Sequence, residues 1–397
     1  MMPKIGTFDG EQAIAQMDEA LLENRAGQLL GRPLQVTDWQ VTLLGGLDSS
    51  PMAGGVYKVA GTAVTAAKNS LDWCLVVKIL RSPEGLTMPD GTPLTKEMAE
   101  DPNNFGYWRR EALAAQSDLF NDLPAGLRVP RFLGITHINE CECWLWQEYL
   151  PEDRAWTWED YRAAAFRLGQ WQGTAVSQIP HHPWLSRNWL AGWVHGPLTG
   201  IFGLVEGIDG YNHPLLTTYF APEELIALRQ LWADRQSYLD MLAQLPKTLC
   251  HLDAHRGNLS WQGDELAMLD WAFVGSGALG EELAAFIGAT LLLDYVLPAD
   301  AKQLEQVAFE GYIAGLRAVD WSGDEALIWK AYQCVMPLRF APPSIASMLR
   351  TAMQPEFAAD WEYKTGKPLA EILAHRAGLV RFYLSRLDEK HYHTVVS

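Results

Sequence analysis

The sequence predicts an α+β protein with two lobes, a small β-rich lobe followed by a larger and mostly helical one. Short apolar segments separated by turn residues prevail up to about residue 149, and segments with helical spacing prevail from residue 158 onward. The chain has 397 residues, of which 48% are hydrophobic and 20% charged, so it is long enough to form two cores. We therefore expect an N-lobe over residues 1–147 and a C-lobe over residues 148–397.

The N-lobe is expected to begin with a helical extension over residues 11–30, where apolar side chains recur at helical spacing. A strand around residues 39–44 should follow, and strands with one helix should continue to residues 143–149. Residues 147–151 are the expected hinge between the lobes. Cys141 and Cys143 have no second pair of ligands at zinc-site spacing, which favours alternating strand positions over a metal site.

Residues 43–59 contain a turn rich in Gly and Ser between two apolar segments. The backbone of such a hairpin loop is suited to covering phosphate groups, and Gly54, Gly55 and Val56 lie at its end. No GxGxxG pattern occurs here, and an ordinary glycine-rich hairpin explains the segment equally well.

Lys78 interrupts the apolar run of residues 73–80, which predicts a buried strand that carries one cation. A buried charge needs a partner, because an unpaired one is costly. Glu111, in the expected helix 107–115, is our candidate. Glu97 and Glu100 are competing partners, and a lysine that reaches solvent from the strand edge is the alternative to a pair.

Residues 251–258, His-Leu-Asp-Ala-His-Arg-Gly-Asn, followed by Asp270, form the most specific pattern of the chain. A hairpin is expected here, with strands at 258–261 and 266–271 joined by a turn at 262–265. Such a hairpin returns Asp270 to the side of Asn258. Asp253 is suited to orienting a hydroxyl and taking its proton, while Asn258 and Asp270 supply the oxygen atoms that a magnesium ion needs in phosphoryl transfer. A polar surface turn is the alternative.

Together these residues resemble the aminoglycoside phosphotransferase and choline kinase superfamily, small-molecule kinases with a protein-kinase-like fold. The family's His-x-Asp-x-His-x-x-Asn loop is matched by His251, Asp253, His255 and Asn258, and Trp271 after the metal aspartate also resembles that group. The similarity runs from about residue 45 to about residue 283, but only the catalytic stretch matches sharply.

The resemblance implies a role for each matched residue. Asp253 would be the catalytic base, and Asn258 and Asp270 would bind Mg²⁺. The ATP phosphates would be bound by Lys78, held by Glu111. The remaining nucleotide contacts would come from the phosphate-covering loop and from the hinge backbone at the adenine, namely Gly54, Gly55, Val56, Glu148 and Tyr149. His251 would orient the loop backbone, whereas His255 is expected either near the reacting groups or buried with its own partners.

The sequence departs from the pattern of protein kinases at two positions. It has Leu252 where they have Arg, and Ala272 where they have Gly. A protein substrate is therefore not expected. Residues 81–93 look like an insertion between Lys78 and its partner. Glu282 stands where the family pattern leads us to expect Asp.

The amino-acid composition limits the kinds of binding partner that we expect. The net charge of −17 and pI near 5.0 disfavour nucleic acid, which requires clustered Lys and Arg, and weakly favour an amine-bearing acceptor. Five cysteines indicate a reducing compartment without a disulfide framework, and neither a signal-like run nor an apolar stretch of membrane-spanning length occurs. We expect a cytoplasmic protein that does not bind membranes.

The expected function is ATP- and Mg²⁺-dependent transfer of the γ-phosphoryl group to a hydroxyl of a small molecule, such as an aminoglycoside or other antibiotic, an amino sugar, a sugar or an amino alcohol. Among the 17 tryptophans, Trp184, Trp189 and Trp193 are candidates for an acceptor pocket, although core packing is the more common role of a tryptophan. A nucleotide-binding pseudokinase or scaffold and a kinase-fold nucleotidyl transferase are the alternatives.

Overall fold

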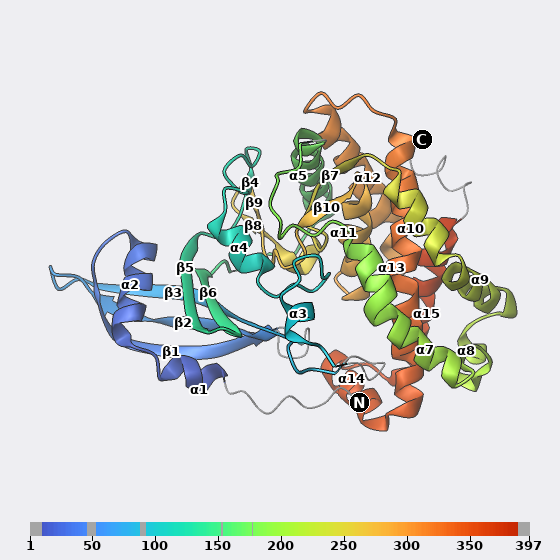
Figure 1. Cartoon of the computed structure of the whole chain (residues 1–397), viewed down its shortest axis with the longest axis horizontal. Coiled ribbons are helices and arrows are strands. Elements are labelled where there is room, and N and C mark those ends of the chain that lie inside the picture. The colour runs from blue at the N-terminus through green and yellow to red at the C-terminus, as the bar shows by residue number, and fades with distance from the viewer. Residues whose placement is uncertain (1–9, 46–52, 88–92, 152–153, 177, 388–397) are drawn as a thin grey trace. The chain divides into compact units, whose positions relative to one another are not determined.

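The computed structural model describes residues 10–45, 53–87, 93–151, 154–176 and 178–387 (Figure 1). The chain forms two compact units. Unit 1 comprises Met1–Asp153 and Ser260–Ala272, and unit 2 comprises Arg154–Leu259 and Phe273–Ser397. The expected fold class is confirmed, since unit 1 is rich in strands and unit 2 is mostly helical. The hairpin at 260–272 belongs to unit 1, whereas the sequence-based division assigned it to the second lobe.

Unit 1 is built on one antiparallel sheet in the order β1-β2-β3-β6-β5. Its strands are β1 (Gln35–Gly45), β2 (Ala53–Val64), β3 (Ser70–Arg81), β5 (Phe132–Asn139) and β6 (Glu142–Glu148). The expected helical extension is divided into α1 (Gly10–Ala15) and α2 (Glu19–Leu30). The division occurs because Asp18 is the N-cap of α2 and its side chain accepts a hydrogen bond from the Ala20 N–H.

The two faces of this sheet differ, because side chains alternate along each strand. On one face, Tyr57, Leu75, Val77 and Trp146 form a core with apolar residues of α1 and α2, including Ile14. The opposite face carries Lys78 on β3. There, α4 (Arg110–Gln116) packs through a smaller apolar cluster, which brings this helix to the face of the lysine.

The rest of unit 1 consists of α3 (Lys96–Ala99) and a small sheet in the order β4-β9-β8, formed by Leu127–Arg128, Glu265–Met268 and Leu259–Gln262. The expected hairpin is present as β8 and β9, with Gly263 in the left-handed conformation at φ 64°. The second strand ends at Met268, earlier than residue 271. Asp270 has φ 58°, a value incompatible with an extended strand.

Unit 2 contains eleven α-helices within the described residues: α5 (Trp158–Ala175), α6 (Trp189–Trp193), α7 (Thr199–Gly207), α8 (Pro214–Tyr219), α9 (Pro222–Ala233), α10 (Arg235–Ala243), α11 (Glu281–Leu292), α12 (Ala301–Arg317), α13 (Glu325–Met353), α14 (Pro355–Thr365) and α15 (Leu369–Leu384). Two short antiparallel strands, β7 (Lys247–Cys250) and β10 (Gly275–Ala278), flank the stretch that contains the predicted catalytic loop. A π-helical turn, Val194–Leu198, joins α6 to α7.

Helix α13 is the centre of unit 2 and contacts α7, α10, α11 and α15 (Figure 1). Helices α5 and α12 approach each other closely because glycines face the contact. A Cβ atom on Gly169 would lie 2.2 Å from the carbonyl oxygen of Tyr312, and one on Gly311 would lie 2.1 Å from that of Arg162. None of the helices in the described ranges combines the length and apolar character needed to cross a membrane.

Candidate active site

Lys78 lies between two carboxylates of unit 1. Its Nζ is 2.5 Å from Glu111 Oε2 and 2.5 Å from Asp270 Oδ1. The side chains of Lys78 and Glu111 are 9% and 2% exposed, whereas that of Asp270 is 41% exposed. The competing partner Glu100 instead accepts hydrogen bonds from the side chains of Trp108 and Arg109. The long insertion therefore does not prevent Glu111 from reaching the lysine.

The two carboxylates keep Lys78 charged. Burial alone would lower the pKa of this lysine, but the negative charges of Asp270 and Glu111 outweigh burial and raise the pKa above its usual value. A cation held between a buried and a more exposed carboxylate has a fixed position. The exposed partner, Asp270, is the one that a bound ion or phosphate group can reach.

Arg110 fixes the backbone on both sides of this ion pair. Its buried guanidinium donates hydrogen bonds to the carbonyl oxygens of Pro102, Asn104, Phe105 and Ala272 at 2.7–3.1 Å. Burial lowers the pKa of Arg110 to about 10. Arg110, the residue before Glu111 in α4, thus also binds Ala272, two residues after Asp270. No motif in the sequence marks Arg110 as a residue of the site.

Trp271 anchors the same stretch from its other side. Its indole is 1% exposed, donates a hydrogen bond to the carbonyl oxygen of Met268 at 2.9 Å, and packs against Phe120 with 4.5 Å between the ring centroids. Together with the bond from Arg110 to Ala272, these contacts hold Asp270 in its left-handed conformation beside Lys78.

The predicted phosphate-covering residues Gly54, Gly55 and Val56 lie at the start of β2, and the turn itself, residues 46–52, lies outside the described residues. Val56 is paired with Lys78 across β2 and β3. Gly55 has φ 106°, which a residue with a side chain rarely adopts. A Cβ atom on Gly54 would lie 2.4 Å from Ile79 Cγ2. Gly55 is therefore required by its backbone conformation, and Gly54 by the close packing of the Ile79 side chain.

The predicted hinge, residues 147–151, begins with the last two residues of β6. The carboxylate of Glu148 accepts hydrogen bonds from Arg128 at 2.5 Å and from the Arg131 N–H at 2.8 Å. Lys58 Nζ lies 4.7 Å from the centroid of the Tyr149 ring. The side chain of Glu148 is thus engaged within unit 1. Of this residue, only the backbone groups stay candidates for a nucleotide contact.

Asp253 of unit 2 is held by two donors. Its Oδ1 accepts a hydrogen bond from Arg339 Nη2 at 2.8 Å, and its Oδ2 accepts one from Asn258 Nδ2 at 3.1 Å. Asn258 Nδ2 also donates to the backbone carbonyl of Asp253 at 3.0 Å. His255 Nε2 lies 3.7 Å from Oδ2. The carboxylate is 22% exposed, so it is fixed in orientation and still accessible.

Glu282, at the start of α11, shapes the loop that carries Asp253. Its carboxylate accepts hydrogen bonds from the backbone N–H groups of His251, Leu252 and Ala254 at 2.7, 3.0 and 3.2 Å. These bonds hold Leu252 at φ 67°, an unusual value for a residue of this type. Burial raises the pKa of Glu282 to about 7, although the backbone donors act in the opposite direction.

The two histidines of the loop bind its backbone. His251 is buried, and its Nδ1 accepts a hydrogen bond from the Asp253 N–H at 3.2 Å. His255 Nδ1 accepts one from the Gly257 N–H at 3.0 Å. Both side chains therefore stabilise the turn around Asp253.

Arg339 is a site residue of unit 2 that no sequence motif predicted. It comes from α13, and besides Asp253 it binds the carbonyl oxygen of Leu252 through Nη1 at 2.7 Å. Its guanidinium lies 4.3 Å from the centroid of the Trp189 ring. Trp189 was a candidate for the acceptor pocket, and it is buried beside Phe273, with 5.0 Å between ring centroids.

The predicted residues thus form two groups. Lys78, Glu111 and Asp270 meet within unit 1, and Asp253, Asn258, His251 and His255 meet within unit 2. Asn258 and Asp270, the predicted metal ligands, belong to different units. No cluster of three or more His, Cys, Asp or Glu side chains suited to a metal ion occurs in the part of the chain that the structure describes.

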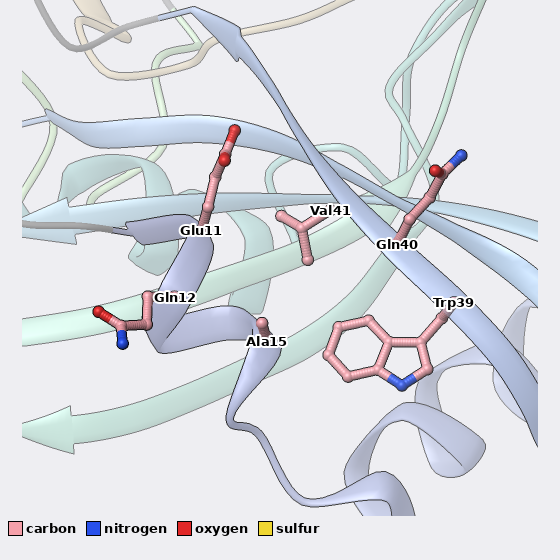
Figure 2. A pocket seen from close by; sticks show the side chains of 6 residues that line it. All are labelled: Glu11, Gln12, Ala15, Trp39, Gln40 and Val41. Atoms are coloured by element: carbon pink, nitrogen blue, oxygen red, sulfur yellow. The ribbon is translucent and has the colours of Figure 1, made fainter.

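Two hollows lie on the sheet of unit 1. One, of about 520 Å³, is lined by α1 and β1, and in Figure 2 Trp39 and Val41 lie on the side of β1 toward α1 while Gln40 points away. The other, of about 590 Å³, has Lys58 and Cys74 among its lining residues. By strand register these two side chains share the face of Lys78.

A family model and several solved structures each match more than half of the chain. The model of the phosphotransferase enzyme family (APH) matches residues 105–321. Similar solved structures include an amicoumacin kinase in complex with AMP-PNP, Ca²⁺ and Ami (13% identity, 91% of this chain and 97% of that chain, TM-score 0.47) and a spectinomycin phosphotransferase in complex with ADP and spectinomycin (13%, 94% and 100%, 0.48). A third is an aminoglycoside phosphotransferase from Alicyclobacillus acidocaldarius (11%, 86% and 91%, 0.49). No curated protein matches the sequence.

Proposed function

The chain belongs to the phosphotransferase enzyme family, and we propose that it transfers the γ-phosphoryl group of ATP to a hydroxyl of a small molecule with the help of Mg²⁺. The family match confirms the resemblance that the sequence motifs predicted. We propose that the nucleotide is ATP, that the metal ion is Mg²⁺ and that the acceptor group is a hydroxyl.

The observation that carries the proposal is the arrangement of Asp253. A base for an acceptor hydroxyl must be a carboxylate of fixed orientation that a substrate can approach. Arg339 and Asn258 each hold one oxygen of this carboxylate, and Glu282 holds the backbone around it. We propose that Asp253 orients the hydroxyl and accepts its proton as the phosphoryl group is transferred.

The nucleotide contacts are proposed for unit 1. Lys78, kept charged by Glu111 and Asp270, is suited to binding the α and β phosphates. Gly54, Gly55 and Val56 would cover the phosphates with their backbone, since bare backbone N–H groups need glycine for close approach. The backbone at Glu148 and Tyr149 would bind the adenine ring.

Asn258 and Asp270 are the proposed Mg²⁺ ligands, and their chemistry suits this ion. Because Asn258 Nδ2 donates to Asp253, the amide oxygen is the atom left for a cation. Asp270 contributes a carboxylate that is 41% exposed. Magnesium prefers oxygen ligands and is commonly held by one or two carboxylates together with substrate phosphates. When bound, the ion neutralises the charge of the phosphate oxygens.

The test is nucleotide turnover by the wild type, Asp253→Asn and Asp264→Asn, an exposed control in the turn between β8 and β9. Each protein is incubated with Mg-ATP and a panel of aminoglycosides, macrolides, sugars, amino sugars and amino alcohols, and ADP release is measured. We expect turnover by the wild type and the control, and a loss of at least about a thousandfold in Asp253→Asn with the nucleotide Kd unchanged. Full activity of Asp253→Asn would refute the assignment.

The same experiment separates the alternatives. Release of pyrophosphate in place of ADP would identify a nucleotidyl transferase. Nucleotide binding without ADP release, even with water as the acceptor, would identify a nucleotide-binding scaffold.

A further inference from the structure

Two long stretches of unit 2 contain no carboxylate. Residues 161–205 and residues 326–355 have neither Asp nor Glu, although the chain has 48 of them in 397 residues. At that average frequency, these 75 residues would contain about nine. Because the chain as a whole is acidic, the absence is a local property of these segments.

Each of these two stretches contributes to the surroundings of Asp253 within unit 2. Arg339, in the second stretch, donates to Asp253 Oδ1, and Trp189, in the first, packs on the guanidinium of Arg339. Trp193 lies parallel to Trp189, with 6.1 Å between ring centroids and 12° between the planes. Helix α13 also contacts the π-helical turn that follows Trp193. What these two stretches place near Asp253 is therefore one arginine and two stacked indoles, without a carboxylate.

Three carboxylates in α11 and just after it, the helix whose Glu282 holds the loop of Asp253, are already engaged. Glu282 is buried and accepts three backbone hydrogen bonds, and Glu281 is buried and accepts one from the Ala278 N–H at 2.9 Å. Asp294 lies 2.9 Å from His375 Nε2. After Trp193, the next carboxylate along the chain is Glu206, near the end of α7.

We propose that the acceptor is a neutral or anionic hydroxyl compound and not a polyamine such as an aminoglycoside. This inference rests on the proposed phosphotransferase function. Each ammonium group of a bound polyamine loses water, and a carboxylate is the partner that compensates this loss best. The two stretches offer none, and the charge of Asp253 itself is already paired with Arg339. The net charge of −17 concentrates amines at the surface in general, but it does not supply carboxylates beside the reactive hydroxyl.

The first test compares acceptors that share a scaffold and differ in charge. Glucuronate, glucose and glucosamine form one set. A second set consists of 4-(hydroxymethyl)benzoate, 4-methylbenzyl alcohol and 4-(aminomethyl)benzyl alcohol. We expect kcat/KM for the ammonium member to be at least about tenfold below that of its neutral or anionic counterpart. An ammonium member that equals or exceeds its counterparts would overturn the proposal.

Direct binding of kanamycin gives an answer that needs no turnover. Titration of kanamycin into the protein loaded with Mg-AMP-PNP should give no saturable binding below about 1 mM. Saturable binding at lower concentration would overturn the proposal. If kanamycin is phosphorylated and the reaction depends on Asp253, the phosphotransferase function stands and only the acceptor class is wrong. If the protein binds no Mg-ATP, the function itself is wrong.

A variant can also reverse the preference. Asn188 is exposed at the N-cap of α6, next to Trp189, and Asp is an equally good N-cap residue. Asn188→Asp should raise kcat/KM for the ammonium member relative to the neutral one by about three- to tenfold. The control Gln303→Glu adds the same charge on an exposed position of α12 and should leave the ratio unchanged. Equal changes in both variants would contradict the proposal.

Discussion

Glu282 Oε2 lies 2.7 Å from the backbone nitrogen of His251, so a buried carboxyl of α11 holds the loop of the proposed base. The pKa of Glu282 is raised from 4.5 to about 7. Between these pH values the folded protein keeps a proton that the unfolded chain has released. This group therefore stabilises the fold fully below pH 4.5, and its contribution is lost as the pH rises through 7, by up to about 3 kcal/mol.

Glu282→Gln removes this titration. We expect the Tm of the wild type to fall more between pH 5 and pH 8 than the Tm of the variant, because glutamine stays uncharged at both values. Differential scanning calorimetry measures the difference, and the exposed Glu356→Gln serves as the control. Parallel pH profiles of the wild type and Glu282→Gln would show that Glu282 does not titrate in this range.

Lys78→Met should weaken ATP binding and destabilise unit 1. The variant lacks the proposed phosphate contact, and Glu111, which is 2% exposed, loses the partner of its charge. Breaking a buried pair on one side costs about 3–5 kcal/mol. We expect the KM for Mg-ATP to rise at least about tenfold and the Tm to fall.

The double variant Lys78→Met with Glu111→Gln tests the pair itself. Its loss of stability should be smaller than the sum of the two single losses, since neither variant residue leaves an opposite charge unpaired. Lys96→Met, which removes an exposed lysine, is the control. Additive losses would mean that the contact between Lys78 and Glu111 contributes little.

The sequence was sufficient to predict those strands and turns whose signal lies in a few neighbouring residues. An apolar run interrupted by one lysine predicted β3 around Lys78, and turn residues predicted the hairpin β8–β9. The bounds shifted where one residue overrides the pattern. Asp18 caps a new helix and divides the extension, and the left-handed Asp270 ends β9 early. Such effects depend on single side-chain and backbone conformations, which periodicity does not report.

The contacts that hold the candidate site were hidden from the sequence because they join distant residues. Arg339 is 86 residues from Asp253, and Arg110 is 162 residues from Ala272. Each arginine stands in a helix and has no motif around it. Glu282 was noticed only as an exception to a family pattern, and its three backbone hydrogen bonds follow from the fold. A single arginine in an apolar run, such as Arg339 within residues 334–343 of α13, is the one signal that could have indicated a partner.

Arg110→Lys should loosen the stretch that carries Asp270. Lysine has three donors on one atom and cannot bind four carbonyl oxygens that surround a planar guanidinium. The carbonyls left without a donor should cost about 3 kcal/mol. We expect a lower Tm and a higher KM for Mg-ATP.

Arg109→Lys is the matched control for this variant, because Arg109 is the adjacent residue and its partner Glu100 is only partly buried. It should change the Tm little. If Arg110→Lys lowered the Tm without any change in the KM for Mg-ATP, the role of Arg110 would be limited to stability and would not extend to positioning Asp270.

Arg339→Lys should slow phosphoryl transfer without affecting nucleotide binding. A lysine places one point charge where the guanidinium binds both Leu252 O and Asp253 Oδ1 and stacks on Trp189. The carboxylate then loses its fixed orientation, and we expect kcat to fall by about ten- to a hundredfold with the KM for Mg-ATP within about threefold of the wild type. The kcat of Arg339→Met should fall further, because methionine also lacks the positive charge. Arg350→Lys, a change on the same helix, should keep the wild-type kcat. A raised KM for Mg-ATP with an unchanged kcat would place Arg339 with the nucleotide and not with the proposed base.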